Sequence, residues 1–540
     1  MIIIVVIAAG LRFYNVTSKG IWYWDEAYYS NIAKAPVYAI DYLLDSKEAS
    51  SLREYLMNRG VIGMPFIKPG HILLMTTSYF LMGVNDYSPA IMMSIVGIAL
   101  IFLVFKFGKE FISKEIGVFA ALILAVSGHF IFYSRSAFPQ MDTVFFGMLG
   151  YYYYLKYIRN QNYPERKYLW YSGASFSMGM LMHQSLAIPI IIFLALEAIF
   201  IWREKRDFKS VISRTYPMWG QIVIVYLAVM LFSKLLFTFF PEIAPRTVLA
   251  TLGDRTVQRL SSVFISYSFS MSEILTVLKM ILTFEGILVL SLTFYGSYAL
   301  WTNREKFGER ISNLLLAQFW IVVLYWSFFS GGHPTGKAFM VIMPQLALIA
   351  AIGIQDILSR IPKMNLKLVA ASVIVIWIMS FGIYNSAPML THKSGYGEAT
   401  VKAVQYAKEK GVTVHREQGG LTPILAFYLG ELYDESDEET QKHINAGSKE
   451  LGDIIFFDYR RYFKPEKNVE VVEAVKGYEP FDSIDNGWVI IREDLFTHYG
   501  AKFEMIKDRV LSQPDYNKIW LYDISVNKEK LPASRFREIE

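Results

Sequence analysis

Residues 88–107 read SPAIMMSIVGIALIFLVFKF, twenty residues in which Lys106 is the single charge. A bilayer core of about 30 Å is crossed by about 20 apolar residues in a helix, so this run predicts a membrane span. Similar runs recur as far as about Tyr384, and hydrophobic residues make up 54% of the chain. Soluble domains are about 45–50% apolar. The excess indicates a polytopic α-helical membrane protein.

Taken together, the apolar runs predict about eleven transmembrane helices. They are residues 1–14, 88–107, 115–133, 143–158, 168–184, 186–202, 216–240, 274–301, 312–330, 338–357 and 368–385. The first run is short for a bilayer, so we expect the natural start to lie upstream. A signal peptide is the less favoured alternative, because no basic segment and no small-residue cleavage site precede Arg12.

The run Pro69–Val84 fits either a further span or a helix at the membrane interface, and the charged loops decide between the two. If it does not cross, five alternate loops are all basic, which places them in the cytoplasm by the positive-inside rule. These loops carry Lys106, Lys109 and Lys114; Lys156, Arg159, Arg166 and Lys167; Arg203, Lys205, Arg206, Lys209 and Arg214; Arg304, Lys306 and Arg310; and Arg360, Lys363 and Lys367. We therefore interpret it as a juxtamembrane segment.

The remaining loops then face outward, together with the whole tail. They are residues 15–87, 134–142, a turn near Gln184, 241–273, 331–337 and the tail from about Ser386. In the tail, a helical pattern over Glu398–Lys410 is followed by short apolar runs that predict strands. These runs are Val412–Val414, Ile454–Phe457, Trp488–Ile491 and Ile519–Tyr522. We predict a transmembrane domain over 1–385 with an outer loop over 15–87, and a small extracytoplasmic α/β domain over 386–540.

Composition excludes several classes of function. The chain has no cysteine, so disulfides, thiolate zinc sites and cysteine nucleophiles are excluded. Its net charge is +5, and its basic residues lie in clusters between the apolar runs. Membrane topology explains that pattern better than nucleic-acid binding does.

Two adjacent acids, Asp25 and Glu26, follow the first span in the stretch WYWDEAYY (residues 22–29). The flanking aromatic residues favour the membrane interface, so these carboxylates should lie at the lipid–water boundary. A solvated loop within an aromatic belt is the plainer interpretation. Adjacent residues on a helix point about 100° apart, so only one of the two acids can address a given atom.

A second candidate group, Ser134, Arg135 and Asp142, lies in a short outward loop, SRSAFPQMD. Charged residues at membrane depth indicate a site unless they pair with each other or extend to the interface. Other basic residues recur on the predicted outer surface, and such cations suit an anionic phosphate. They are Lys68, His71, His183, Arg246, Arg255, Arg259, His333 and Lys337. Each could equally be an interfacial anchor.

Two further patterns carry less weight. Residues 331–337 read GGHPTGK, which matches phosphate-loop spacing, but Ala338 replaces the required Ser or Thr and no strand precedes the loop. The histidines lack ligand spacing, so no metal site is assigned. A divalent metal nevertheless remains possible, with Asp25 and Asp142 as ligands.

Over about residues 1–357 the arrangement resembles the GT-C superfamily of glycosyltransferases, which includes protein O-mannosyltransferases and lipid A aminoarabinose transferases. The resembling features, in order, are Asp25 and Glu26 followed by Tyr28 and Tyr29; Lys68 with Pro69; Ser134, Arg135 and Asp142; and Lys337 ahead of Pro344. The chain departs from many relatives at His183, near which they carry a lysine, and at Ala338, where they carry a tyrosine.

The resemblance implies an inverting hexosyl- or pentosyltransferase of the cell membrane. It would move a sugar from a polyprenyl (dolichyl or undecaprenyl) phosphate to a lipid, glycan or protein acceptor at the outer face. Asp25, Glu26 and Asp142 are the expected catalytic residues, with Asp25 as general base. The expected donor-phosphate ligands are Lys68, Arg135, Lys337, His333, Arg255 and Arg259.

Two other classes of protein remain open. A secondary transporter or lipid flippase would use the intramembrane charges of Glu197, Lys234, Lys279 and Glu285. Inverted repeats and broken helices would favour it, and the sequence indicates neither. A membrane anchor that presents the outer domain to a partner is the third possibility.

Overall fold

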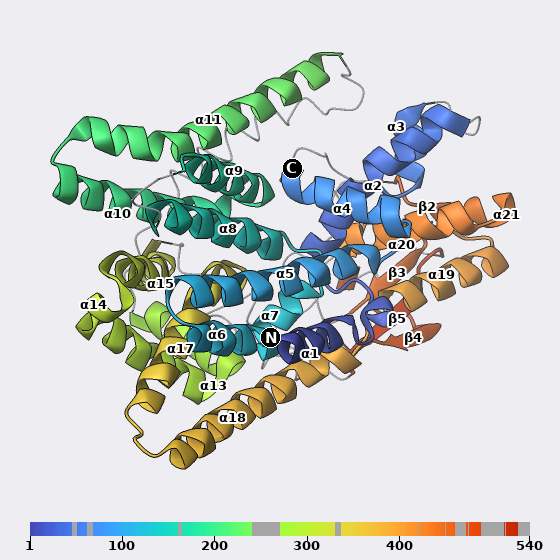
Figure 1. The fold of residues 1–540 in the computed structure, drawn as a ribbon. Coiled ribbons are helices and arrows are strands. Elements are labelled where there is room, and N and C mark those ends of the chain that lie inside the picture. Colours follow the sequence, from blue (N-terminus) through green and yellow to red (C-terminus); the bar gives the residue numbers. More distant parts are fainter. Residues whose placement is uncertain are drawn as a thin grey trace.

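The computed structural model describes residues 1–45, 51–61, 68–159, 165–239, 271–329, 336–418, 421–448, 450–458, 471–472, 475–487, 512 and 515–526. Each of the eleven predicted spans falls on helical structure. The corresponding helices are α1 (Ile2–Phe13), α5 (Ser88–Phe111), α6 (Lys114–Val126), α7 (Gly128–Ser134), α8 (Gln140–Arg159), α9 (Lys167–Met182), α10 (Ala187–Lys205), α11 (Phe208–Phe239), α13 (Met271–Thr302), α15 (Glu309–Phe329), α16 (Gly336–Phe339), α17 (Met343–Ser359) and α18 (Met364–Thr391). Figure 1 shows them as a bundle with most axes roughly side by side.

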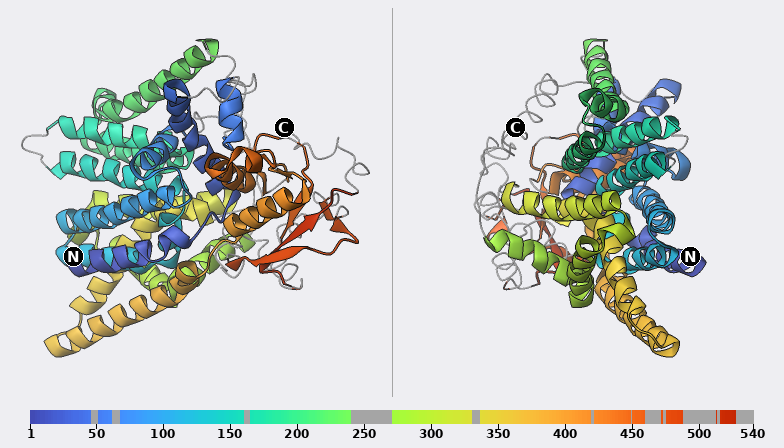
Figure 2. Two further views of the ribbon diagram at one scale, coloured as in Figure 1. Left: turned by 90° about the vertical axis from the view of Figure 1, so that its right-hand side faces the viewer. Right: turned by 60° about the vertical axis from the view of Figure 1, so that its left-hand side comes forward.

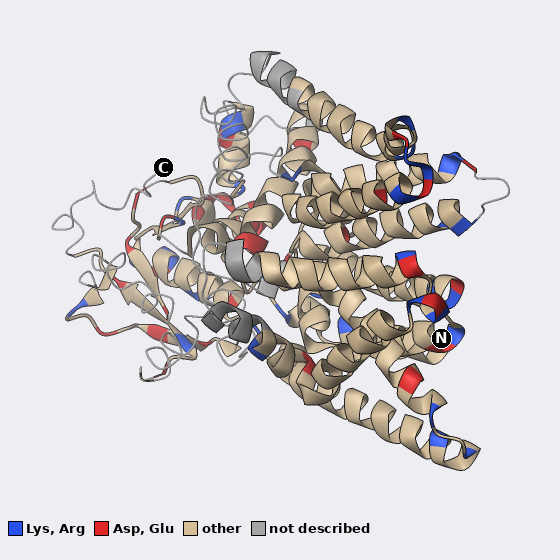
Figure 3. Cartoon of the chain, turned by 90° about the vertical axis from the view of Figure 1, so that its left-hand side faces the viewer, with Lys and Arg blue, Asp and Glu red and all other residues tan. Residues whose placement is uncertain are grey.

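Within the described residues, five helices are long and apolar enough to cross a membrane, or six if the bent pair α6–α7 is one span. The fold is therefore that of a membrane protein, and the number of eleven spans stays a prediction. Figure 3 shows charged residues concentrated toward the two ends of the bundle, with a mostly uncharged band between them. That distribution is expected where the middle of the bundle lies in hydrocarbon.

Two of the helices are interrupted, contrary to the expectation of unbroken spans. Helices α6 and α7 meet at 67°. Ser127 lies at the break, where its side chain accepts a hydrogen bond from the Phe130 N–H at 3.1 Å and so caps the new helix. Helix α13 is broken at Gly286, whose φ of 83° is readily adopted only by glycine.

Three helices from the predicted outer loop lie together at one end of the bundle: α2 (Trp24–Asp45), α3 (Leu52–Asn58) and α4 (Pro69–Met82). Helix α4 contains the ambiguous run. Its 14 residues correspond to about 21 Å of helix, less than the roughly 30 Å of a bilayer core. This length fits a juxtamembrane segment better than a span.

The tail forms a small mixed α/β unit at the same end of the bundle (Figure 2). Its helices are α19 (Tyr396–Lys410), α20 (Thr422–Glu435) and α21 (Glu438–Gln441). Strand β1 (Val414–His415) pairs in parallel with β2 (Ile444–Asn445), and β5 (Lys518–Asp523) lies antiparallel between β3 (Ile454–Phe457) and β4 (Asp482–Asp485). The strand predicted over Trp488–Ile491 lies outside the described residues.

Helix α20 docks on α2 through side chains that bind its backbone. Asn31 donates to the Pro423 carbonyl at 2.7 Å, and Lys34 donates to the Phe427 carbonyl at 3.1 Å. The Tyr428 hydroxyl accepts from the Ile21 N–H at 2.9 Å. The main hydrophobic core is likewise continuous from the bundle into the tail. The tail therefore fixes the segment that leads into α2.

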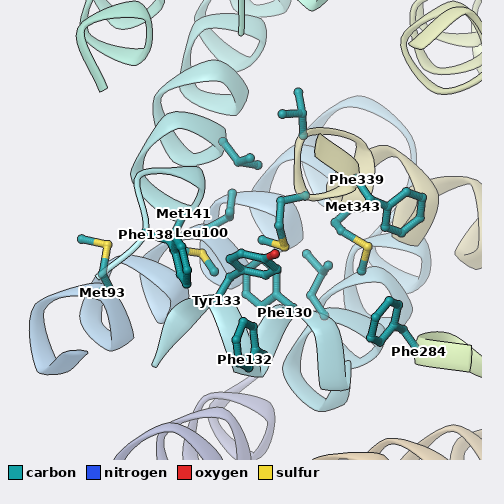
Figure 4. Close-up of a cluster of buried hydrophobic side chains, with 14 of the residues drawn as sticks. Met93, Leu100, Phe130, Phe132, Tyr133, Phe138, Met141, Phe284, Phe339 and Met343 are labelled. Carbon is teal, nitrogen blue, oxygen red and sulfur yellow. The ribbon is translucent and has the colours of Figure 1, made fainter. Parts of the chain in front are cut away.

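Below this end of the bundle lies a dense aromatic and methionine core (Figure 4). Trp22 stacks on Phe132 with ring centroids 5.8 Å apart, and Tyr23 meets Phe138 edge-on at 5.2 Å. Trp22 and Tyr23 are both fully buried. This packing anchors the residues immediately before Asp25 to the loop that follows α7.

Candidate active site

The stretch WYWDEAYY places Asp25 and Glu26 in the first turn of α2, where they point to different surroundings. The Asp25 side chain is 28% exposed, whereas that of Glu26 is 2% exposed. This separation follows from the 100° between adjacent helical residues. Of the two acids, Asp25 is the one that a substrate can approach.

Glu26 is held by donors from its own segment and from the loop after α7. The Lys19 ammonium lies 2.5 Å from Oε1, and the Ala137 N–H donates to the same oxygen at 3.2 Å. The Trp22 N–H donates to Oε2 at 3.0 Å. A buried carboxylate requires such partners, because removing an unpaired charge from water is very unfavourable. Glu26 therefore tethers the start of α2 to the loop.

Asp142 begins α8 and is likewise fully buried. Its Oδ2 lies 2.7 Å from Nδ1 of His71, and Nε2 of the same imidazole lies 3.2 Å from the Ala137 carbonyl oxygen. Ala137 thus bonds Glu26 through its N–H and His71 through its C=O. We call Lys19, Glu26, His71, Ala137 and Asp142 the buried network.

Two predicted cations lie beside these acids. Lys337 of α16 forms an ion pair with Asp25, and its ammonium lies 5.0 Å from the centroid of the Phe138 ring. We call Asp25 and Lys337 the open pair. Lys68, just before α4, donates to the Tyr29 hydroxyl and lies 4.2 Å from the centroid of that ring. Tyr29 is one helical turn after Asp25, so the two lysines lie beside the first two turns of α2.

Arg135, a predicted phosphate ligand, is bonded to the protein backbone. Its guanidinium is 1% exposed and donates to the carbonyls at the end of α1. The three acceptors are Leu11 at 3.1 Å, Arg12 at 3.1 Å and Tyr14 at 2.6 Å. Helix ends leave carbonyls without partners, and a buried arginine can satisfy several of them. Arg135 therefore caps a helix and is committed within the protein.

The other predicted phosphate ligands, His333, Arg255 and Arg259, lie outside the described residues. The intramembrane acids of the transporter interpretation have partners on neighbouring helices: Glu197 accepts from the Tyr154 hydroxyl, and Glu285 accepts from Ser127 at 2.7 Å. Among the residues described, no group of three or more His, Asp or Glu side chains could hold a metal ion. Asp25 and Asp142, the candidate metal ligands, are instead paired with Lys337 and His71.

Sequence reasoning missed Lys19, the contact between Tyr29 and Lys68, and the pairing of His71. Lys19 is seven residues before Glu26 and separated from it by a turn, so helical spacing gives no sign of the contact. His71 and Asp142 are 71 residues apart. The sequence does contain one signal for the role of His71: it follows Lys68 by one helical turn, at the start of the same helix.

Several solved structures resemble the chain, and no curated protein sequence matches it. The archaeal oligosaccharyltransferase AglB from Archaeoglobus fulgidus, in complex with an inhibitory peptide and a dolichol-phosphate, superposes with a TM-score of 0.54 at 12% identity, over 89% of this chain and 72% of that one. The apo form of the Archaeoglobus fulgidus enzyme gives 0.55 at 12% identity, over 87% and 70%. ArnT from Cupriavidus metallidurans bound to undecaprenyl phosphate gives 0.49 at 11% identity, over 89% and 81%, so the fold assignment rests on the archaeal enzyme.

A family model described as dolichyl-phosphate-mannose-protein mannosyltransferase matches residues 65–237. That range includes α4, the loop after α7 and the start of α8, and thus Lys68, His71, Arg135 and Asp142. The chain is a polytopic membrane protein with paired acids and lysines at one end of its bundle. Its fold is that of the GT-C superfamily.

Proposed function

We propose that this chain is a glycosyltransferase that moves a sugar from a polyprenyl phosphate onto an acceptor at the outer face of the membrane. The observation that carries the proposal is the open pair, a partly exposed carboxylate against a lysine, at one end of a GT-C fold. Arginine and lysine bind phosphate through charge-assisted hydrogen bonds. The ligands named with the similar structures, dolichol-phosphate and undecaprenyl phosphate, are lipid phosphates of the expected donor class.

In the proposed reaction, the acceptor nucleophile forms a bond to the anomeric carbon while the bond from that carbon to the phosphate oxygen breaks. Asp25 takes the proton from the nucleophile, which requires it to lie within hydrogen-bond reach. The electron pair of the broken bond leaves with the lipid phosphate, and Lys337 and Lys68 stabilise the charge that develops there. A single displacement inverts the configuration at the sugar carbon.

The ion pair between Lys337 and Asp25 implies that the donor binds before Asp25 can act as a base. While the lysine pairs with the carboxylate, it occupies an oxygen that would otherwise accept the proton of the nucleophile. An arriving donor phosphate competes for the same ammonium. Transfer of Lys337 from Asp25 to the phosphate would free the base only when the donor is bound, so binding and activation are coupled.

We propose that the site and the tail lie outside the cytoplasm, because the five basic loops belong at the opposite end. The sugar must then be attached to the polyprenyl phosphate by another enzyme before the donor reaches this site. The acceptor is a lipid, a glycan or a protein. The hexose or pentose identity of the sugar is part of the test below.

The test is sugar transfer by the purified full chain in liposomes containing labelled polyprenyl-phosphate sugars and envelope extract. Asp25→Asn should lower transfer by about 100- to 10,000-fold, the range of general-base catalysis. Asp41→Asn, the same change at an exposed position of α2, is the matched control and should leave transfer unchanged. A folded Asp25→Asn variant with wild-type transfer would contradict the proposal.

A transporter or flippase is the second candidate, and the helix breaks at Ser127 and Gly286 favour it. Glu285 accepts from Ser127 and directly precedes the break in α13. Carboxylates at broken helices within a membrane often mark a transport path. Movement of solute or lipid across the same liposomes without sugar transfer, abolished by Glu285→Gln, would establish this function in place of the first.

A further inference from the structure

The His71 imidazole is enclosed and uses both of its nitrogens. Its side chain and that of Asp142 are each 0% exposed. Nδ1 lies 2.7 Å from Asp142 Oδ2, and Nε2 lies 3.2 Å from the Ala137 carbonyl oxygen. The ring also meets Tyr29 edge-on, with centroids 5.4 Å apart. His71 thus cannot turn without losing contacts to three different segments.

These contacts restrict where the protons are. A carbonyl oxygen only accepts hydrogen bonds, so Nε2 of His71 must carry a proton. The contact between Nδ1 and Oδ2 then contains one proton, carried either by the imidazole or by the carboxyl group. In both arrangements the pair has no net charge. This condition is favourable for two groups that are both removed from water.

The position of the pair relates it to the proposed chemistry. His71 is on the first turn of α4, one turn after Lys68, and Asp142 is on the first turn of α8. Ala137 receives His71 at its carbonyl and offers its N–H to Glu26, the neighbour of Asp25. The imidazole therefore joins the beginnings of α4 and α8 and, through the backbone of the single residue Ala137, the beginning of α2.

We propose that His71 is a positioning residue that holds the Asp142 carboxylate in its working orientation through the Nδ1 contact. This inference rests on the proposed function, in which the buried Asp142 helps to organise the site beside the open pair. The contact of Nε2 with the Ala137 carbonyl stabilises the loop after α7, and the contact of Nδ1 fixes the orientation of the Asp142 carboxylate. Transfer consequently depends more strongly on the first nitrogen than on the second.

Two amide substitutions separate the nitrogens. The amide nitrogen of asparagine is as many bonds from Cα as Nδ1, and that of glutamine is as many as Nε2. His71→Asn therefore keeps a donor toward Asp142, and His71→Gln keeps a donor toward Ala137. We expect His71→Asn to retain turnover within about 3-fold and His71→Gln to lose about 10- to 100-fold, the usual cost of misplaced catalytic groups.

Whether the His71 substitutions change kcat or KM distinguishes a positioning role from a role in donor binding. Because Lys68 and Lys337 are unchanged, the KM for the polyprenyl-phosphate sugar should stay within about 3-fold while kcat falls. His443→Gln, at a histidine of the tail that contacts the Val412 carbonyl at 2.8 Å, is the matched control. Equal turnover of His71→Asn and His71→Gln, or a loss confined to KM, would overturn the proposal.

A second measurement tests the pairing without any substrate. Thermal unfolding of His71→Gln, Asp142→Asn and the double variant forms a double-mutant cycle. The pairing predicts that the double variant is no less stable than the less stable of the two single variants, and additive losses would refute it. A wild-type chain that transfers no sugar contradicts the proposed function, whereas this cycle still decides whether His71 and Asp142 act together.

Discussion

The open pair and the buried network lie within a few residues of each other, yet they surround their carboxylates in opposite ways. Asp25 is 28% exposed and pairs with Lys337, which comes from a distant helix. Glu26 and Asp142 are buried and bonded to neighbouring segments through several contacts. A substrate could replace the pairing of Asp25 with Lys337. Several buried contacts would have to rearrange before either of the other acids could act on it.

The difference teaches that acids which look equivalent in sequence divide into one that is partly exposed and two that are buried and join neighbouring segments. It also predicts that substitutions in the two groups affect different measurable quantities. The Asp25→Asn variant described above should lose transfer and keep its stability. The following variants test the division further, from larger to smaller expected effects.

Glu26→Gln should destabilise the folded chain by about 3–5 kcal/mol, the usual result of removing one partner of a buried ion pair. Lys19, 2% exposed, would be left without its carboxylate partner. The measurement is thermal unfolding in detergent, with Asp41→Asn as the matched control. A stability loss below about 1 kcal/mol would mean that Glu26 does not tether the segment before α2.

Glu431 of α20 extends the test to a partly buried acid outside the network, and here the effect on stability depends on pH. Burial raises the pKa of Glu431 to about 8, from the ordinary value of 4.5. The folded chain therefore binds a proton that the unfolded chain releases, and stability falls as pH rises from about 5 to 8.

Glu431→Gln removes that dependence. We expect the variant to match the wild type near pH 5 and to exceed it by a few kcal/mol at most near pH 8, measured by thermal unfolding at each pH. The Lys34 pKa is lowered to about 8 by burial, so its own contribution rises only above that pH. Parallel stability curves for the two proteins would contradict the assignment.

Lys337→Gln should raise the donor KM by about 10-fold, equivalent to about 1.4 kcal/mol, because one charge-assisted contact to phosphate is lost. Its effect on stability should be within about 1 kcal/mol, as is usual for a partly exposed ion pair. Lys337→Arg keeps the charge and serves as the control. An unchanged KM in Lys337→Gln would remove this lysine from the donor site.

Much of the helical framework could be predicted from hydropathy, because burying apolar runs in lipid requires helices whatever their neighbours are. The break at Ser127 could not, since a serine followed by Gly128 fits a cap, a turn or an ordinary helix equally well. The tail's α/β character was apparent. Its continuity with the bundle core was not, because it depends on contacts such as Asn31 with Pro423, which are 392 residues apart.

In the site, residue types indicated where charges gather but not which partner each would take. Arg135 could reach solvent, phosphate or backbone from the same loop, and the end of α1 decides the outcome. Asp142 could pair with Arg135 or with His71, and only the position of α4 distinguishes them. Partner choice between segments far apart in sequence is a three-dimensional property, and local periodicity carries no information about it.

The docking of α20 on α2 has a consequence for the order of events during synthesis. The backbone acceptors for Asn31 and Lys34 come from residues made 392 and 393 positions later. At roughly 5–20 residues per second, a ribosome takes about 20–80 s to supply them. Throughout that interval the nascent chain already holds Asp25 and Glu26 without the helix on which α2 docks, so the end of the bundle that carries the candidate site is completed only after Phe427 has been made.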